Sequence, residues 1–119
     1  MLDDSTVSIS FLKERVRDFI VEREWVKYHN PKDLAVSISV EVGELLEIFQ
    51  WRSVDEVKDM VRDEEWLNRI CEELADIFIY ILSMANVLNI DLTTIVLEKL
   101  KKNAEKYPVD KYRGRAFVD

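Results

Sequence analysis

Two acidic pairs stand where the helical pattern of the sequence calls for apolar residues. In the stretch SVEVGELLEIFQW (residues 39–51), Glu41 falls within an apolar stripe that recurs every three to four residues, and Glu44 follows one turn later. The stretch EELAD repeats the anomaly with Glu73 and Asp76. Residues three apart share a helix face, so each pair presents two carboxylates together. Two antiparallel helices could bring all four into one partly buried pocket.

Four neighbouring carboxylates repel one another, and desolvation adds several kcal/mol for each unpaired charge. Protonation, pairing with arginine or binding of a cation would relieve that cost. Hard oxygen ligands suit Mg²⁺, Mn²⁺ or Ca²⁺. Acidic pairs at this spacing also occur on solvated helix faces, but two pairs that each interrupt an apolar stripe favour a divalent-cation site. A di-iron bundle would need Glu-x-x-His motifs, and the single histidine, His29, lies outside both pairs.

Helices must position these pairs, and apolar periodicity predicts four long ones. They cover roughly residues 10–28, 31–50, 64–88 and 92–106. A short helix is expected after Ser53, with a bend near Asp63. Asn30, Ser53 and Asp91 are the predicted N-caps, because their side chains can accept a backbone N–H. Short connections favour antiparallel neighbours, so the predicted fold is an all-α, antiparallel four-helix bundle.

The length of 119 residues predicts a single domain over residues 1–119, with residues 110–119 as an irregular tail. A net charge of −7 argues against binding to a nucleic acid polymer, which needs a basic face. The start MLDDSTVSIS lacks a signal-peptide pattern, and the nearly uncharged run 77–90 is too short to span a bilayer. No membrane association is expected, and the predicted location is cytoplasmic. Cys71 is predicted to be a buried, inert thiol.

The acidic motifs resemble those of a known family. EVGE followed by EELAD is similar to the Glu-x-x-Glu, Glu-x-x-Asp signature of the MazG-like all-α nucleoside triphosphate pyrophosphohydrolases. The wider strings EREWVKYHNPKDLAVSISVEVGELLEIFQW, EELADIFIYIL, KNAEKYPV and RGRA resemble the dCTP pyrophosphatase branch, mainly over residues 10–109. The resemblance implies Mg²⁺-dependent hydrolysis of a nucleoside triphosphate, dCTP-like or modified, to the monophosphate and pyrophosphate. Such an activity would serve nucleotide pool sanitation.

The same resemblance implies roles for the acidic residues. Those expected to hold Mg²⁺, or alternatively Mn²⁺, are Glu41, Glu44, Glu73 and Asp76. A water activated by the metal or by a carboxylate would attack the phosphate chain, and Glu44 is the candidate for the base that takes its proton. The bound metal would also offset charge that develops on the transferring phosphoryl group.

Aromatic residues near predicted helix ends extend the resemblance to the substrate. It points to Trp25, His29 and Trp51 as base-pocket residues, since aromatic rings can stack on a nucleobase and His29 can hydrogen-bond to it. Trp25 and His29 are four apart at the end of the first predicted helix, and Trp51 ends the second. Trp66 has no counterpart in the resemblance and is predicted to lie in the core.

Further substrate contacts are expected on the later helices. Tyr80 lies one turn beyond Asp76 and corresponds to a substrate-contacting tyrosine of the branch. On the fourth predicted helix, residues spaced by four form a stripe towards the phosphates and sugar: Lys99, Asn103 and Tyr107. Glu47 and Glu72 could reach a second metal, although a solvated position is the simpler interpretation. The segment 52–71 follows no pattern of the branch.

The run IFIYILSMANVL (residues 77–88) is apolar around nearly its whole circumference, so it must be covered on all sides. A two-fold dimer would cover its exposed side, and the resemblance implies dimers or pairs of dimers, so a homodimer or homotetramer is the predicted assembly. Two alternatives remain for the function. One is a broad-specificity MazG-like or phosphoribosyl-ATP pyrophosphohydrolase, and the other is a non-catalytic helical interaction module.

Overall fold

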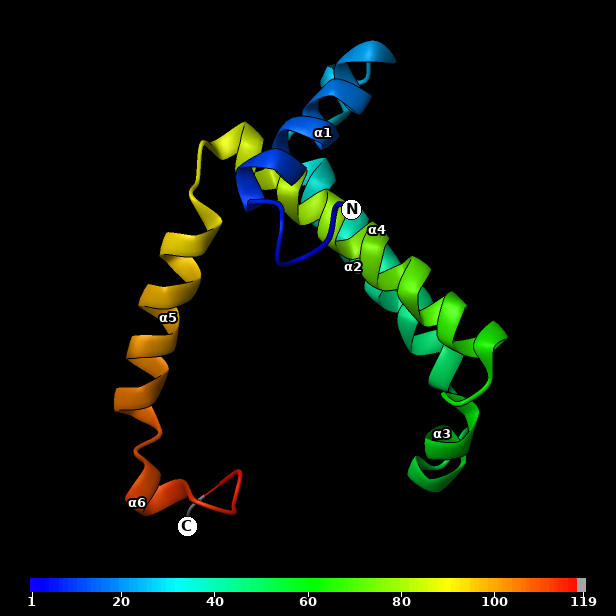
Figure 1. The fold of residues 1–119 in the computed structure, drawn as a ribbon, viewed down its shortest axis with the longest axis vertical. Helices are drawn as coiled ribbons and strands as arrows, with labels where there is room; N and C mark the ends of the chain where they lie inside the picture. Colours follow the sequence, from blue (N-terminus) through cyan, green and yellow to red (C-terminus); the bar gives the residue numbers. More distant parts are fainter. Residues whose placement is uncertain (118–119) are drawn as a thin grey trace. The chain divides into compact units, whose positions relative to one another are not determined.

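The computed structural model describes residues 1–117, and within that range every regular element is helical, which confirms the predicted all-α class. In chain order the elements are α1 (Ile9–Glu22), η1 (Val26–Tyr28), α2 (Pro31–Phe49), α3 (Val54–Met60), α4 (Glu64–Leu88), α5 (Leu92–Lys106) and α6 (Val109–Tyr112). Figure 1 labels the α-helices. The chain divides into two compact units, Met1–Asn89 and the part from Ile90 onward. The acidic pairs both lie in the first unit.

Helix α4 is the centre of the first unit. Helix α2 lies along it and α1 packs against it (Figure 1). The buried apolar side chains of this unit are Ile20, Leu34, Ile48, Met60, Leu82 and Ala85. Asn86 ties α1 to α4, because its Nδ2 donates to the Lys13 carbonyl at 2.9 Å and its Oδ1 accepts from Arg17 Nη2 at 2.9 Å. This frame fixes the two helices that carry the acids.

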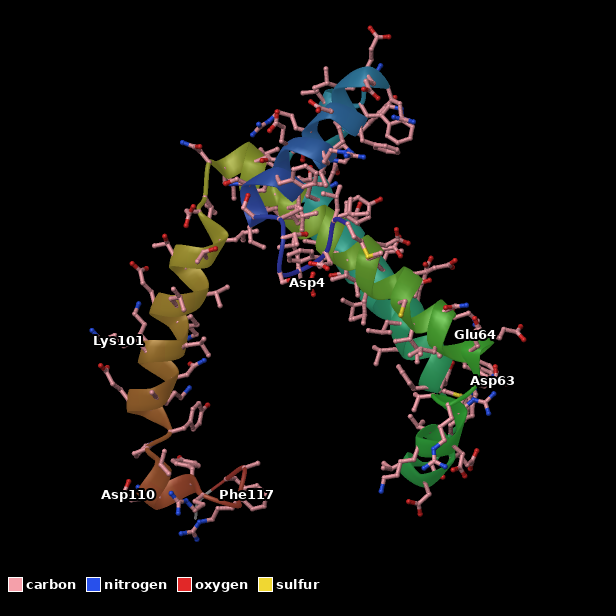
Figure 2. All side chains as sticks on the ribbon, viewed as in Figure 1. Asp4, Asp63, Glu64, Lys101, Asp110 and Phe117 are labelled. Carbon is pink, nitrogen blue, oxygen red and sulfur yellow. The ribbon has the colours of Figure 1, made fainter. Side chains whose placement is uncertain are left out.

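Local side-chain caps set where most helices begin. The predicted caps are confirmed, since Asn30, Ser53 and Asp91 each accept a hydrogen bond from the backbone N–H three residues later. Asp63 also caps α4, but it accepts from the Glu65 N–H two residues later, and Figure 2 labels Asp63 and Glu64 at this junction between α3 and α4. The bend expected near Asp63 is therefore a complete break between two helices.

The first helix is shorter than predicted. It ends at Glu22 instead of continuing to Tyr28, because Glu24 adopts a left-handed backbone with φ of 55°. The Glu24 N–H then donates to the Val21 carbonyl and the Trp25 N–H to the Ile20 carbonyl, both at 3.0 Å, which is a Schellman termination. Glycine is the usual residue at this position, so a glutamate gave no sequence signal. Trp25 and His29 consequently flank the 3₁₀ turn η1 and do not share an α-helical face.

Two predictions of burial, for Cys71 and Trp66, are wrong. Cys71 is exposed, because it lies at helical spacing with the exposed Leu67 and Leu74. Trp66 is half-buried, and the guanidinium groups of Arg52 and Arg69 lie over its ring, 4.7 and 4.6 Å from the centroid. Both follow from α4 contacting neighbours on part of its circumference only, which sequence periodicity could not reveal.

The second unit contains α5, on which Figure 2 labels Lys101, and the short helix α6. Helix α6 corrects the prediction of an irregular tail over residues 110–112, while residues 118–119 lie outside the described range. The rings of Tyr107 and Tyr112 meet edge to face at 5.1 Å. Within its described part this unit has no buried side chain.

The helices of residues 1–117 were compared with the length and apolar composition that a membrane-spanning helix needs. No single helix there is both long and apolar enough to cross a bilayer. Helices α4 and α5 reach that length and composition only when they are taken together as a pair broken between Leu88 and Leu92.

Candidate functional site

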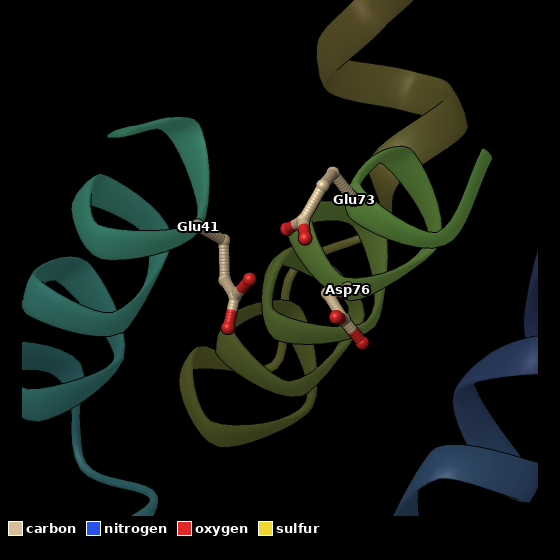
Figure 3. A group of neighbouring side chains, drawn as sticks. All are labelled: Glu41, Glu73 and Asp76. Atoms are coloured by element: carbon tan, nitrogen blue, oxygen red, sulfur yellow. The ribbon is translucent and has the colours of Figure 1, made fainter. Parts of the chain in front are cut away.

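Three carboxylates converge between α2 and α4. Glu41, Glu73 and Asp76 each offer an oxygen within 4.8 Å of the others. Figure 3 shows the Glu41 side chain extending from α2 towards α4 and the Glu73 side chain extending from α4 towards α2, with Asp76 on the adjacent turn. Two oxygens bound to one Mg²⁺ or Ca²⁺ lie at most about 4–5 Å apart, since each bond is about 2.0–2.6 Å long. The cluster therefore has the size of a divalent-cation site.

Burial distinguishes two of these carboxylates from ordinary surface acids. The Oε2 atoms of Glu41 and Glu73 are both fully buried and have no hydrogen-bond partner. The ion pairs shown within residues 1–117 join other residues, such as Lys58 with Asp55, and do not neutralise the cluster. Buried charged oxygens without partners destabilise a fold. A cation placed among them would supply the missing partner, so the donor set fits a divalent metal.

The electrostatics of Glu41 reflect the same crowding. Desolvation by burial, close approach of the Glu73 and Glu44 carboxyls, and repulsion from Glu44 and Asp76 together raise the pKa of Glu41 to about 7 from an ordinary value of 4.5. Without a cation, this carboxyl therefore holds a proton up to near-neutral pH. A bound divalent cation would favour the charged form and displace that proton.

Glu44 stands slightly apart from the other three predicted ligands. It is exposed, and it lines a small acidic cleft of about 200 Å³ with Glu47, Glu72, Glu73 and Arg69. Glu73 belongs both to this cleft and to the buried cluster. Glu44 thus lies next to the cluster on the solvent side. The two acids that sequence reasoning treated as solvated, Glu47 and Glu72, border the same cleft.

A larger cleft, of about 370 Å³, opens on the other side of Asp76. Three of the predicted substrate residues line it, namely Trp25, His29 and Tyr80. The imidazole of His29 lies against the Tyr80 ring with centroids 6.2 Å apart and planes inclined by 27°. Because Asp76 lines this cleft and belongs to the acidic cluster, a ligand in the cleft would extend directly towards the carboxylates.

Sequence reasoning missed several residues of this cleft. Phe19 supports Trp25 through an edge-to-face contact with centroids 6.0 Å apart, and Tyr28 and Ser37 also line the cleft, together with Ile20 and Ile79. Tyr28 follows Trp25 by three residues in an aromatic-rich stretch, which is a signal that could have been used. Ser37 and Phe19 could not be found without knowing how α1, α2 and α4 pack.

The remaining predicted substrate residues lie outside this cleft. Trp51 follows the C-terminal end of α2, has φ of 69° and is 91% exposed. Helix α2 has 19 residues, about 28 Å of length, between Trp51 and the end near His29. Of the stripe predicted on the fourth helix, Lys99 and Asn103 lie in α5, whereas Tyr107 is its non-helical C-cap before Pro108, and all three belong to the second unit.

The fold and the carboxylate cluster define the chain as an all-helical protein with an acidic site, suited to a divalent cation, between two helices. The sequence profile of the MazG-like family matches residues 36–116, which include all four acids. The chain belongs to the MazG-like family.

Individual proteins are also similar to this chain. dCTP pyrophosphatase 1 of Rattus norvegicus is 36% identical over 99 residues, which are 83% of this chain and 58% of that protein. The Homo sapiens protein of the same name is 35% identical over 91 residues, or 76% of this chain and 54% of that protein. The chain therefore spans little more than half the length of these relatives.

Among solved structures, a crystal structure of a pyrophosphatase from Archaeoglobus fulgidus is similar over almost its whole length. The match has a TM-score of 0.79 and 42% sequence identity, and it covers 91% of this chain and 99% of that one.

Proposed function

We propose that this chain is a Mg²⁺-dependent nucleoside triphosphate pyrophosphohydrolase that acts on dCTP-like deoxynucleotides. The observation that carries the proposal is the pair of buried, unpartnered carboxylate oxygens of Glu41 and Glu73 beside Asp76, on the border of an aromatic cleft. The similarity to proteins named dCTP pyrophosphatase and to a solved pyrophosphatase supports the same reaction.

In the proposed reaction, Glu41, Glu73 and Asp76 would hold the metal, and Glu44 lies next to them on the solvent side. When bound, Mg²⁺ would supply positive charge to the triphosphate oxygens and to the transferring phosphoryl group. Glu44 is proposed to accept the proton of the attacking water, because it is exposed and lies outside the trio of acids whose oxygens converge. The bond between the α- and β-phosphates breaks, which gives the monophosphate and pyrophosphate.

The cleft next to Asp76 is the proposed base site. Trp25 and Tyr28 offer aromatic faces for stacking, which is worth about 1–3 kcal/mol per base. His29 and Ser37 offer the polar contacts that distinguish one base edge from another. Lys99, Asn103 and Tyr107 are proposed to contact the phosphates and sugar, and pool sanitation is the proposed role.

We propose that two or more copies assemble, with both units of each chain in one functional domain. Exposed apolar side chains support assembly, notably Leu67, Leu74 and Phe78 at helical spacing on α4. The family match runs across the boundary between the two units, which supports a single domain. Trp51, exposed at the far end of α2, would then reach a base site only from a partner chain. Light scattering at low micromolar concentration tests this, since 14.1 kDa is the mass of one chain.

A nucleotide panel tests the proposed reaction. The purified chain is incubated with deoxy- and ribonucleoside triphosphates in Mg²⁺, in Ca²⁺ or in EDTA, and ³¹P NMR identifies the products. Monophosphate and pyrophosphate formed from dCTP in Mg²⁺ alone are the expected result. Broad turnover of all triphosphates, or of phosphoribosyl-ATP, would favour the corresponding relatives, and no turnover of any nucleotide would favour a non-catalytic interaction module.

A further inference from the structure

Ser83 is a buried polar residue that the proposed mechanism does not use. It lies in α4 and is 2% exposed, the one buried polar side chain among the described residues. Its Oγ lies 2.9 Å from His29 Nδ1, although the two residues are 54 positions apart in the chain. A buried hydroxyl without a partner would destabilise the fold, so this contact satisfies Ser83 as well as His29.

The contact fixes one half of the His29 imidazole. Nδ1 is engaged by Ser83, and the ring face lies against Tyr80, so both the direction and the plane of the ring are defined. The other nitrogen, Nε2, is then the one available to a ligand. Residue 29 also follows the turn η1, where the Tyr28 N–H donates to the Trp25 carbonyl at 2.9 Å and the His29 N–H donates to the Val26 carbonyl at 3.0 Å, and these bonds limit its movement.

Counting protons indicates which nitrogen carries hydrogen. A serine hydroxyl has one hydrogen to donate, and within residues 1–117 the partner that the structure gives Ser83 Oγ is His29 Nδ1. If Nδ1 accepts that hydrogen, both groups are satisfied and the neutral ring carries its proton on Nε2. If Nδ1 donated instead, the buried hydroxyl hydrogen would need another acceptor. Burial also lowers the pKa of His29, which favours the neutral ring.

We propose that Ser83 is a positioning residue that donates to His29 Nδ1 and thereby holds His29 as a neutral Nε2–H donor facing the nucleotide cleft. This inference rests on the proposed function for its ligand, but its structural part does not. A fixed Nε2–H donor recognises an acceptor on the base edge, such as a pyrimidine carbonyl or unprotonated ring nitrogen. It would reject an edge that offers only an amino group, because two donors would then oppose each other.

The test uses the fact that His29 is the single histidine of the chain, so its imidazole signals need no assignment. Long-range ¹H–¹⁵N correlation spectra of the free protein at pH 8 should show a pyrrole-like Nε2 and a pyridine-like Nδ1. Ser83→Ala should move both ¹⁵N shifts towards the averaged values of exchanging tautomers, and Ser83→Thr should restore the original pattern. A protonated Nδ1 in the unaltered chain would overturn the proposal without reference to any variant.

Kinetics supply the second readout. Ser83→Ala should raise the KM of the preferred nucleotide by about 3- to 10-fold, the effect of one hydrogen bond, and leave kcat within about twofold. Ser39→Ala, on an exposed position of α2, is the matched control and should change neither. Unchanged KM and ¹⁵N shifts in a folded Ser83→Ala chain would sink the idea. If the unaltered chain hydrolyses no nucleotide, the proposed function fails, and the spectra alone still decide the role of Ser83.

Discussion

The pairing of α2 with α4 joins two regions of opposite character. Leu34 on α2 and Leu82 and Ala85 on α4 are 1–2% exposed, so they form an apolar region in which burial stabilises the fold. Further along the same two helices, Glu41 and Glu73 each have a buried carboxylate oxygen without a hydrogen-bond partner. The apolar region therefore stabilises the pairing of the two helices, and the buried carboxylates destabilise it in part.

The difference teaches where function can be recognised in a small helical protein. An acid that appears at a core position and lacks a partner in the folded chain is costly, and folding alone gives no reason for it. The apolar region gives the helix pair enough rigidity to keep the acids close. If this division is right, changes in the two regions should separate activity from stability.

The largest expected effect is on turnover. Glu73→Gln keeps the shape of the side chain but removes a ligand charge, so turnover in saturating Mg²⁺ should fall by about 10³-fold, equivalent to about 4 kcal/mol. Circular dichroism melting should show a chain at least as stable as the parent in EDTA, because repulsion is relieved. Glu14→Gln, on an exposed part of α1, is the control. Turnover within threefold of the parent would remove Glu73 from the site.

The apolar region should respond in the opposite manner. Leu34→Ala leaves a cavity at a position that is 1% exposed, so the free energy of unfolding should fall by about 3 kcal/mol. Urea unfolding measures the loss. At a temperature where the variant is folded, the dissociation constant for Mn²⁺ should change by less than about threefold, since no ligand is altered. A large loss of metal affinity in the folded variant would mean that the two regions are not separable.

A third prediction distinguishes the aromatic cleft from the acids beside it. Trp25→Ala should weaken nucleotide binding in Ca²⁺ by about 1–3 kcal/mol and leave cation binding without nucleotide unchanged. Isothermal titration measures both. Trp51→Ala should produce a similar loss only in a sample that light scattering shows to be oligomeric. Equal affinity in the parent and the Trp25→Ala chain would leave Trp25 as packing for Phe19.

The smallest effect concerns pH. The folded-state pKa of Glu41, about 7, exceeds its ordinary value of 4.5, so the folded chain binds the extra proton in this window. The resulting stabilisation is complete below the lower value and is lost as pH rises through the upper one. In EDTA, the melting temperature of the parent relative to that of Glu41→Gln should therefore decrease as the pH is raised from about 4.5 to about 7. Added Mg²⁺ should stabilise the parent increasingly over the same range, because the metal needs the charged carboxylate.

Sequence reasoning succeeded where the physics is local. Asn30, Ser53 and Asp91 cap their helices through contacts with residues three positions away, so the sequence contains both partners. The bounds of α4 followed from its apolar periodicity, although its cap, Asp63, was not predicted. The convergence of Glu41 with Glu73 and Asp76 could also be anticipated, because two regular stripes on adjacent helices have few ways to pair.

It failed where tertiary packing decides. The exposure of Cys71 depends on which side of α4 has a neighbour, and periodicity does not specify this for a helix that is apolar on several sides. The contact of His29, at the end of η1, with Ser83 on α4 joins residues 54 positions apart and leaves no periodic trace in the sequence. The assembly of copies stays a prediction for the same reason.

The left-handed turn at Glu24 determines which substitutions this position tolerates. The Glu24 side chain has no role in the proposed reaction, yet the backbone conformation of Glu24 directs the chain from α1 into the turn that carries Trp25 and His29. A saturation scan at this codon should therefore rank residues by their tolerance of positive φ, with glycine and asparagine at the top and valine and isoleucine at the bottom. Glu24→Val is a substitution at an exposed position, yet it should displace the turn that carries Trp25 and His29 and so distort the cleft.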